Sequence, residues 1–290
     1  MKLLIIGASS FLGNHLYDFF QGKKDFSTFG TYFKNKTKSD FLYFDALNKD
    51  QVSSTLSELR PDHIIVLSGN KNLKQCELDY EKAYSLNFCP AKNVAEAVSE
   101  NNLKSRIIFF SSDYVFEGSK GYYSDSDECF PKTNYGKTKL LAETFLLKSP
   151  VRMKILRTSA VMGKGGLFFE WLISALKKEK RLSMFTNVFF TPTPINFLCE
   201  GIDFLVSRFD EIEQKVIHLV GELRLNRFEF AKICQINLGN FNTLLEPAME
   251  DTSTSLFKHD LSMIQSEILK NFQKESFETY LRSVTDAFKA

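Results

Sequence analysis

The sequence predicts an α/β protein in which a doubly wound parallel sheet is followed by a smaller C-terminal lobe. Three observations predict this class: short apolar runs alternate with helical patterns, a glycine-rich turn follows the first run directly, and the alternation breaks down beyond residue 157. Strands that alternate with helices form parallel sheets with helices on both faces. With 290 residues, the chain is long enough for one large domain or for one domain with an added lobe.

The elements of the first half follow from the spacing of apolar residues. Short apolar runs predict strands over residues 3–6, 28–33, 41–44, 63–67, 107–110 and 154–156. Apolar residues spaced by about 3.6 positions predict helices over residues 50–59, 79–100 and 133–147. A further helix is expected to begin at the glycine-rich turn after the first strand.

The pattern changes beyond residue 157, where we expect a separate lobe. The elements predicted in this part are a helix over residues 167–178, a turn over residues 191–194, a strand over residues 215–220 and a charged helical tail.

Composition and charge argue against several classes of protein. The chain has 37 Lys plus Arg against 35 Asp plus Glu, a formal net charge of +2, and it carries no basic tract, so nucleic acid is not an expected partner. No apolar run is long enough to cross a membrane, and the first one is too short for a secretory signal. The five cysteines lack the close pairing of a zinc site. We expect a cytoplasmic protein with free thiols and no metal, and the sequence leaves a homodimer open.

The glycine-rich turn has the context of a dinucleotide-binding site. Its sequence is Gly7-Ala8-Ser9-Ser10-Phe11-Leu12-Gly13. Glycine permits a tight turn, and the N-terminus of the following helix offers free amides and a positive dipole to a pyrophosphate. Ser10 stands where a central glycine is usual, but its backbone amide stays available.

The second strand indicates which dinucleotide is bound. NAD sites usually end this strand with an acid that binds the ribose hydroxyls, whereas NADP sites place cations near the added phosphate. The end of the strand carries no carboxylate and contains Thr31, Tyr32, Lys34 and Lys36. NADP is therefore the predicted cofactor. NAD stays open, because lysines in a loop are often simply solvated.

A phenol, an ammonium and a hydroxyl are placed where one catalytic site can use all three. Tyr135 and Lys139 are four residues apart on a predicted helix and so share a face. An ammonium beside a phenol lowers the pKa of the phenol and makes it a better acid. Ser112 follows the strand predicted over residues 107–110, where a hydroxyl can hold a substrate oxygen. The set predicts a carbonyl-reducing enzyme, although the Tyr and Lys spacing also occurs in ordinary exposed pairs.

These motifs define the expected domains. We assign residues 1–160 to an NAD(P)-binding Rossmann domain, with a return segment near residues 192–215. We assign residues 161–191 and 216–290 to the substrate-binding lobe.

With these residues assembled, the chain resembles the extended short-chain dehydrogenases/reductases, and most closely the branch similar to dTDP-4-dehydrorhamnose reductase. The resemblance covers nearly the whole chain. It rests on the glycine turn, Phe44-Asp45-Ala46, Cys76-Glu77 with Asn87, residues 111–118, Tyr135 and Lys139 followed by Glu143, residues 156–159, and Pro192-Thr193.

The resemblance implies roles for individual residues. It makes Ser112, Tyr135 and Lys139 the catalytic triad. With the end of the second strand, the expected cofactor site consists of Gly7, Ser9, Ser10, Phe11, Leu12, Gly13, Thr31, Tyr32, Lys34, Asp45, Ala46, Leu67, Ser68, Tyr135, Lys139 and Thr158. The expected substrate site consists of Asn70, Ser112, Asp113, Tyr114 and Tyr135, with a structural turn role left open for Asp113.

Two departures from the branch concern the lining of the pocket. Ala160-Val161-Met162 stands where the branch has an aromatic wall beside the sugar. The segment Leu67-Ser68-Gly69-Asn70-Lys71 brings a lysine and an amide to the nicotinamide end, where a small, alanine-rich segment is usual.

The function implied by the resemblance is reduction of the C4 keto group of a nucleotide-linked deoxysugar, with hydride from NADPH and the proton from Tyr135. Two alternatives stay open. A nucleotide-sugar 4-epimerase or dehydratase with retained NAD uses the same triad, but without net consumption of NADPH. A non-catalytic NADP-binding regulatory subunit, similar to the beta subunit of methionine adenosyltransferase, would have a stable partner and no turnover.

The remaining ionisable residues are expected to be structural or exposed. This expectation covers the four histidines, whereas the carboxylates Glu77, Glu117 and Glu143 are expected to be solvated or to stabilise helices.

Overall fold

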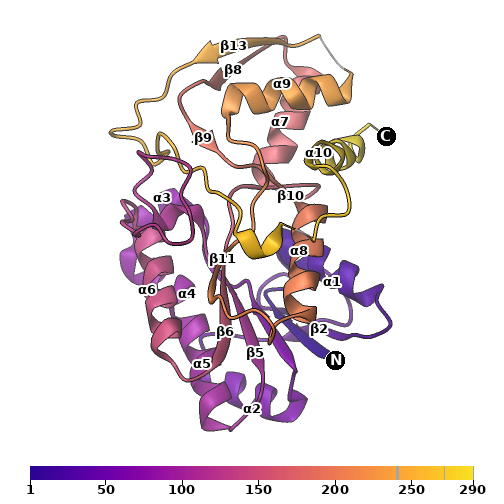
Figure 1. Ribbon diagram of the computed structural model, residues 1–290, viewed down its shortest axis with the longest axis vertical. Helices are drawn as coiled ribbons and strands as arrows, with labels where there is room; N and C mark the ends of the chain where they lie inside the picture. Colours follow the sequence, from indigo (N-terminus) through magenta and orange to yellow (C-terminus); the bar gives the residue numbers. More distant parts are fainter. Residues whose placement is uncertain (240–241, 271, 290) are drawn as a thin grey trace. The chain divides into compact units, whose positions relative to one another are not determined.

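The computed structural model describes residues 1–239, 242–270 and 272–289 (Figure 1). The chain divides into two units. Unit 1 comprises Met1–Val115, Cys129–Arg157 and Leu205–Ile217. Unit 2 comprises Phe116–Glu128, Thr158–Phe204 and the described residues from His218 onward.

Unit 1 is built on a seven-stranded sheet in the order β11-β6-β5-β4-β1-β2-β3. The pairs from β3 to β6 are parallel, and Leu3 of β1 lies opposite both Thr28 of β2 and His63 of β4. The strands are β1 (Lys2–Ile6), β2 (Ser27–Tyr32), β3 (Leu42–Tyr43), β4 (His63–Val66), β5 (Arg106–Phe110), β6 (Arg152–Arg157) and β11 (Val216–His218).

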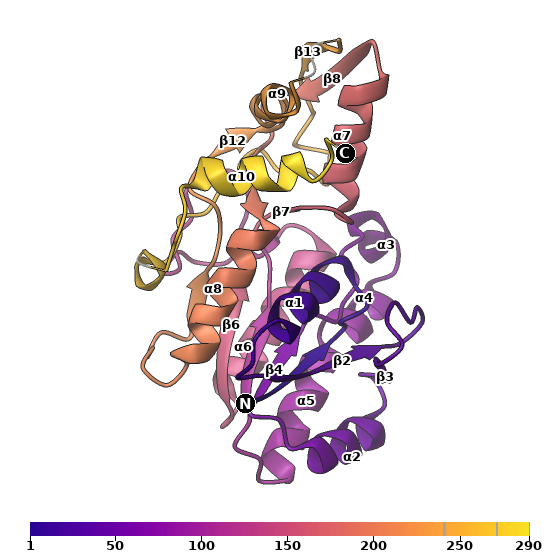
Figure 2. The ribbon, with the colours of Figure 1, turned by 90° about the vertical axis from the view of Figure 1, so that its right-hand side faces the viewer.

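Helices connect these strands and cover the sheet. They are α1 (Phe11–Gln21), α2 (Lys49–Leu59), α3 (Leu73–Leu78), α4 (Tyr80–Asn87), α5 (Cys89–Glu100) and α6 (Asn134–Lys148), with a 3₁₀ turn η1 (Asp113–Val115). Figure 1 shows α2, α4, α5 and α6 gathered on one side of this unit. Apolar side chains of α2, α5 and α6 form one core with alternate residues of the strands, such as Leu4, Ile64 and Ile107. Helix α1 packs against β1 and β2 (Figure 2).

The winding direction of the chain reverses between β1 and β4. From β1 the chain continues to β2 and β3 on one side, and from β4 it continues to β5 and β6 on the other. In open α/β sheets, ligands bind outside the carboxyl ends of the strands at such a reversal. The predicted doubly wound Rossmann sheet is confirmed, and both the glycine turn and residues 67–71 follow strands at the reversal.

One predicted helix is wrong in its extent. Residues 79–100 form two helices, α4 and α5, which meet at Phe88. Pro90 lies in the first turn of α5, where its missing N–H is tolerated, whereas inside one continuous helix it would remove a hydrogen bond. The apolar spacing continues across the break, and the proline was the available signal.

The segment before β11 is fixed to the edge of the sheet by buried polar contacts. Lys154 of β6 donates from Nζ to the carbonyl oxygens of Ile212 and Gln214, the second at 2.8 Å. Burial lowers the pKa of Lys154. Ile155 donates its backbone N–H to the carbonyl of Lys215 at 2.7 Å. The strand expected over residues 215–220 is present but shorter, as β11.

Unit 2 consists of helices with three short pairs of strands. The helices are α7 (Leu167–Lys178), α8 (Ile195–Ser207), α9 (Arg227–Leu238) and α10 (Phe277–Asp286), with a 3₁₀ turn η2 (Glu267–Leu269); the last residues of α8 belong to unit 1. The strand pairs are β7 (Val161–Met162) with β10 (Thr193–Pro194), β9 (Phe189–Phe190) with β12 (Leu225–Asn226), and β8 (Arg181–Phe185) with β13 (Leu244–Ala248). Helix α7 has the predicted bounds.

Aromatic rings make up much of the interior of unit 2. The ring of Phe230 in α9 lies 5.5 Å from Phe190 and 6.2 Å from Phe169, measured between centroids. Such pairs contribute beyond the apolar area they bury. The turn expected over residues 191–194 is wrong in part, because Thr193 and Pro194 form β10 beside β7.

His63 at the start of β4 is a buried titratable group of unit 1. Its Nδ1 has no hydrogen-bond partner among the described residues, and its ring meets Phe209 edge to face at 5.7 Å. Burial, together with the nearby charge of Arg106, lowers the pKa of His63 to about 4. The protonated ring is therefore favoured in the unfolded chain, whose histidines titrate near 6.5.

We predict that His63 makes the protein sensitive to mild acid. Its contribution to stability is complete above about pH 6.5 and is lost as the pH falls toward 4, which amounts to about 2 kcal/mol between pH 7.5 and pH 5. Urea unfolding of parent and His63→Gln at both pH values should show a smaller acid loss in the variant by about that amount. The control His259→Gln changes an exposed histidine and should lose as much stability between pH 7.5 and pH 5 as the parent does. Equal losses in parent and His63→Gln would show that His63 is not the sensitive group.

Candidate active site

The glycine turn has the geometry that a close backbone approach requires. Gly7 has a φ of +86°, and a side chain there would come within 3.2 Å of the backbone nitrogen of Ser68. A side chain at Gly13 would overlap the carbonyl oxygen of Gly7. Only glycine at both positions lets the turn close under the first turn of α1.

Ser10 replaces the usual central glycine without strain. Its φ of −77° and ψ of 166° are open to any residue, and its hydroxyl accepts a hydrogen bond from the N–H of Gly13 at 3.1 Å. Ser10 is thus the N-cap of α1. Phe11 and Leu12 are the first two residues of α1, where a helix leaves its amides without internal partners.

Thr31 is part of the turn rather than of an open ligand surface. Its side chain is buried and Oγ1 accepts a hydrogen bond from the N–H of Gly7 at 3.0 Å, while its carbonyl accepts one from Ser9 at 3.2 Å. The hydroxyl of Thr31, within β2, therefore supports the glycine turn. Its expected contact with a cofactor phosphate stays a prediction.

Lys34 and Lys36 are exposed in the loop after β2. The ammonium of Lys34 lies 6.0 Å from the ring centroid of Phe33, and that of Lys36 lies 5.4 Å from the ring of Tyr32. Lys38 of the same loop is paired with Asp18 at 2.7 Å. Lys34 and Lys36 are therefore the cations of this loop that stay open to a phosphate.

The loop is tied to α1 near the glycine turn. Thr37 donates from Oγ1 to Asn14 at 2.9 Å, and Asn14 donates to the carbonyl of Ser10 at 3.1 Å. The exposed lysines are thus carried by a loop whose far end is fixed to α1.

The residues expected near the adenine and the inner ribose lie at the ends of β3 and β4. The Asp45 carboxylate accepts a hydrogen bond from Leu47 at 2.9 Å, and the carbonyl of Ala46 accepts one from Asn93 at 3.0 Å. Leu67 donates its N–H to Ile6 at 3.0 Å. The hydroxyl oxygen of Ser68 is buried and has no partner in the described part of the chain, so it has capacity for a ligand.

Helix α6 packs tightly against the turn that carries Ser112. Thr133 is its N-cap and accepts a hydrogen bond from Gly136 at 3.1 Å. A side chain at Gly136 would overlap the carbonyl oxygen of Tyr114 in η1. The glycine after Tyr135 is therefore needed for this approach, and it fixes where Tyr135 lies relative to η1.

The Ser112 hydroxyl lies close enough to the Tyr135 phenol to lower the pKa of the phenol. The Ser112 hydroxyl donates to the Asp113 carboxylate at 2.8 Å and accepts from the N–H of Tyr114 at 3.3 Å. The rings of Tyr114 and Tyr135 meet edge to face with centroids 5.9 Å apart. Asp113 is buried and orients Ser112, in agreement with the turn role that the sequence left open.

The expected effect on the Tyr135 phenol is wrong in direction. Burial raises its pKa, the nearby Asp113 carboxylate adds to this rise, and the hydrogen bond with Ser112 opposes it. The sequence placed Lys139 beside the phenol but could not give the degree of burial, which dominates here. Tyr135 is therefore neutral at neutral pH and holds its proton.

Lys139 lies one turn further along α6 and is also buried. Its Nζ donates to the carbonyl of Phe110 at the end of β5, at 2.7 Å, and lies 4.7 Å from the ring centroid of Phe109. Burial lowers the pKa of Lys139 to about 8, and the Glu143 carboxylate opposes this shift.

Glu143, one further turn along, is not solvated as expected. Its side chain is 1% exposed and pairs with Arg157 of β6 at 2.7 Å. It also accepts a hydrogen bond from the hydroxyl of Ser111. Isolated carboxylates are rarely buried without such partners. Sequence reasoning missed this residue; its place four residues after Lys139 on the same helix face was the available signal.

Asn87 joins the loop after β4 to α6. Its Oδ1 accepts a hydrogen bond from the N–H of Asn70 at 2.6 Å, and its Nδ2 donates to Thr138 at 3.1 Å. The predicted residues of β4, β5 and α6 are thus linked within unit 1. Thr158, by contrast, belongs to unit 2, where it is buried.

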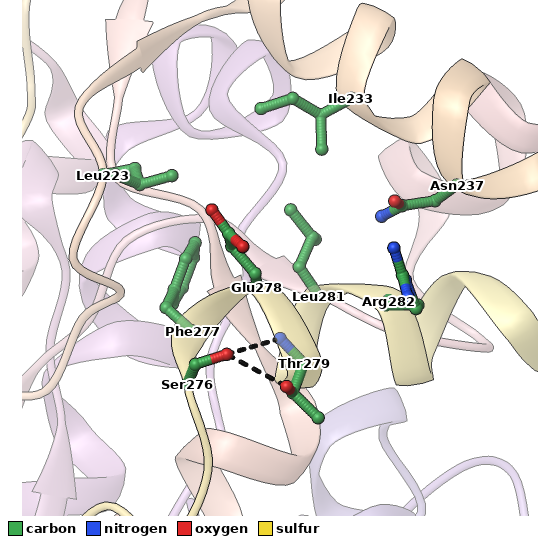
Figure 3. Close-up of a pocket in the computed structure, with 9 residues that line it drawn as sticks. All are labelled: Leu223, Ile233, Asn237, Ser276, Phe277, Glu278, Thr279, Leu281 and Arg282. Carbon is green, nitrogen blue, oxygen red and sulfur yellow. Dashed lines mark hydrogen bonds between the residues drawn. The ribbon is translucent and has the colours of Figure 1, made fainter.

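A hollow of about 330 Å³ lies within unit 2, between α9 and α10 (Figure 3). None of its lining residues is among the predicted site residues. Within the described ranges, no three His, Cys, Asp or Glu side chains are grouped to hold a metal ion, and no helix is long and apolar enough to cross a membrane.

Comparison with known families gives this arrangement its context. The profile of the family described as RmlD substrate binding domain matches residues 1–290. The chain belongs to this family. The match covers the glycine turn, the Ser112 turn and α6 together.

Relatives of the family include several named enzymes. The dTDP-4-dehydrorhamnose reductase of Aggregatibacter actinomycetemcomitans is 28% identical over 235 residues, 79% of this chain and 76% of that protein. Matches to further curated reductases of this name span about half of their lengths. The mouse methionine adenosyltransferase 2 subunit beta is 28% identical over 163 residues, 56% of this chain and 48% of that protein.

A solved structure shares the fold over nearly the full length. The dTDP-4-dehydrorhamnose reductase of Bacillus anthracis, in complex with NADP, matches with a TM-score of 0.85 and 24% identity over 99% of each chain.

We predict that Gly136→Ala destabilises the protein, although alanine is the better helix former by about 1 kcal/mol. The added methyl group meets backbone rather than a movable side chain, and overpacking of this kind costs about 1–3 kcal/mol. Urea unfolding should therefore show a net loss. The control Gly22→Ala, where the nearest atom is 3.6 Å away, should leave stability within about 0.5 kcal/mol. Equal stability of the two variants would contradict the packing argument.

Proposed function

We propose that this protein is an NADPH-dependent reductase of a 4-keto nucleotide-linked deoxysugar, similar in activity to dTDP-4-dehydrorhamnose reductase. The observation that carries the proposal is the contact of Ser112 with Tyr135, one turn before the buried Lys139. Family membership and the names of the relatives support the same activity. We propose Ser112, Tyr135 and Lys139 as the catalytic residues.

The residues present fit a dinucleotide. Gly7 and Gly13 open the backbone of the turn, the first amides of α1 point away from the helix, and Ser68 has an unsatisfied buried hydroxyl. Lys34 and Lys36 supply positive charge for the 2′-phosphate of NADP. When bound, the cofactor supplies the hydride.

Tyr135 is the proposed proton donor. A phenol whose pKa is raised keeps its proton at neutral pH and releases it to an oxygen that becomes strongly basic as it gains charge. Ser112 donates a hydrogen bond to the same oxygen, once its hydroxyl turns away from Asp113. General acid catalysis of this kind contributes about 10²–10⁴-fold to the rate.

Lys139 contributes a positive charge and hydrogen-bond donors to the proposed site. With a pKa of about 8, its ammonium is charged at neutral pH and offers two N–H groups beyond the one bound to Phe110. We propose that these bind the ribose hydroxyls at the nicotinamide end. Asn70, Asp113 and Tyr114 are the residues proposed to contact the sugar.

Two alternatives differ in measurable ways. Retention of NAD without net consumption of NADPH would indicate an epimerase or dehydratase. The similarity to the mouse beta subunit favours a regulatory role as second candidate, which would show NADP binding, a stable partner and no turnover. The homodimer, the cytoplasmic location and the domain boundaries stay predictions from the sequence.

We predict that Tyr135→Phe lowers turnover of a 4-keto nucleotide sugar by at least about 100-fold, because the variant keeps the ring and loses the transferable proton. Affinity for NADPH, measured by fluorescence titration, should change little. The control Tyr122→Phe alters an exposed tyrosine outside the triad and should keep parent turnover. Full activity of Tyr135→Phe would remove the catalytic assignment.

We predict that Lys34 and Lys36 make NADPH bind more tightly than NADH. The 2′-phosphate carries about two negative charges, so the double replacement Lys34→Ala with Lys36→Ala should weaken NADPH binding about tenfold and leave NADH unchanged. Calorimetry at low and moderate salt should show the preference of the parent shrinking with salt.

The double replacement Lys23→Ala with Lys24→Ala is the matched control, since it removes the same charge beyond the far end of α1. If this control weakens NADPH binding equally, only net charge matters, and the assignment to Lys34 and Lys36 is wrong.

A further inference from the structure

The loop after β4 runs from the glycine turn to Lys139. At its start, the backbone nitrogen of Ser68 is 3.2 Å from the position of a side chain on Gly7. At the next position, a side chain on Gly69 would come within 3.7 Å of Nζ of Lys139. A dinucleotide that reaches from the turn to Lys139 therefore passes along residues 67–71.

The end of this loop is rigidly anchored. Asn70 donates its backbone N–H to Oδ1 of Asn87 at 2.6 Å. The Oδ1 of Asn70 accepts a hydrogen bond from the backbone N–H of Asn72 at 3.0 Å. The thiol of Cys76 donates to the carbonyl of Asn70 at 3.4 Å. Lys71 lies between Asn70 and Asn72, so these contacts hold its backbone in place.

The Lys71 side chain extends to the first residue of α1. Its Nζ lies 5.8 Å from the ring centroid of Phe11, the residue with which α1 begins. Lys71 is exposed, and in the described ranges no carboxylate forms an ion pair with it. An ammonium and the positive end of a helix repel each other when they lie close together, and a bound anion removes this repulsion.

We propose that Lys71 binds the pyrophosphate of the dinucleotide and closes the phosphate site over the first turn of α1. The inference rests on the proposed cofactor site, but not on turnover. It separates two sets of cations: Lys34 and Lys36 contact the 2′-phosphate that only NADPH carries, whereas Lys71 contacts the group that NADPH and NADH share.

The test is the binding of three probes to the full chain with Lys71→Met, which keeps the length of the side chain and removes its charge. Affinity for NADPH and for NADH should fall by the same factor, about fivefold. Affinity for 2′-AMP, which lacks the pyrophosphate, should not change. The control Lys74→Met, an exposed lysine on α3, should leave all three affinities at parent values.

Three results would overturn the proposal. These are unchanged affinity of Lys71→Met for both dinucleotides, an equal loss for 2′-AMP, and a loss seen only as a raised KM for the nucleotide sugar. Failure of the proposed function looks different: the parent would bind dinucleotide, Lys71→Met would still weaken it, and no nucleotide sugar would be reduced.

Discussion

The contact on which the site depends most is the hydrogen bond from the buried Lys139 ammonium to the carbonyl of Phe110. It joins the end of β5 to α6, and through it the turn with Ser112 and the helix with Tyr135 keep a constant distance. Burying an ammonium is costly unless opposite charge and hydrogen bonds compensate. Glu143 supplies the charge from the next turn of α6, and its contacts with Arg157 and Ser111 orient that carboxylate. A network of charged groups therefore supports the site, in addition to apolar contacts.

The cofactor side of unit 1 is organised by an excess of positive potential. The free amides at the start of α1, the ammonium of Lys71 and the exposed Lys34 and Lys36 are all positive. We propose that they contact successive parts of the cofactor. Positive groups placed close together repel each other, so their arrangement lowers stability until an anion binds. Rigid loops keep them in place: Asn87 holds one loop and Asn14 the other. Because these charged groups are already in position, little binding free energy is lost to rearrangement when the ligand binds.

The sequence was informative where chemistry depends on local spacing. The alternation of apolar runs, the glycine turn and the four-residue step from Tyr135 to Lys139 gave the sheet, α1 and the shared face of α6. The sequence was uninformative where the burial of a side chain decides its contacts or its pKa. Glu143 has the local pattern of an exposed helical carboxylate, the strand pattern around Thr31 does not show that its hydroxyl bonds to Gly7, and the pKa of Tyr135 depends on burial. The break between α4 and α5 was readable from Pro90. The roles of the individual site residues stay proposals until they are tested.

The contacts of Lys154 and Asp210 with the edge of the sheet have a consequence for how the chain is made. Strand β6 is complete once residue 157 is synthesised, but its neighbour β11 and the carbonyls that receive the Lys154 ammonium come from residues 212–218. Arg106 and Arg152 likewise form their ion pairs only after Asp210 has been synthesised. During translation the nascent sheet therefore carries an open strand edge and a buried lysine without acceptors, which is the condition that favours pairing with other chains. About fifty residues of unit 2 must leave the ribosome before the first unit can be closed.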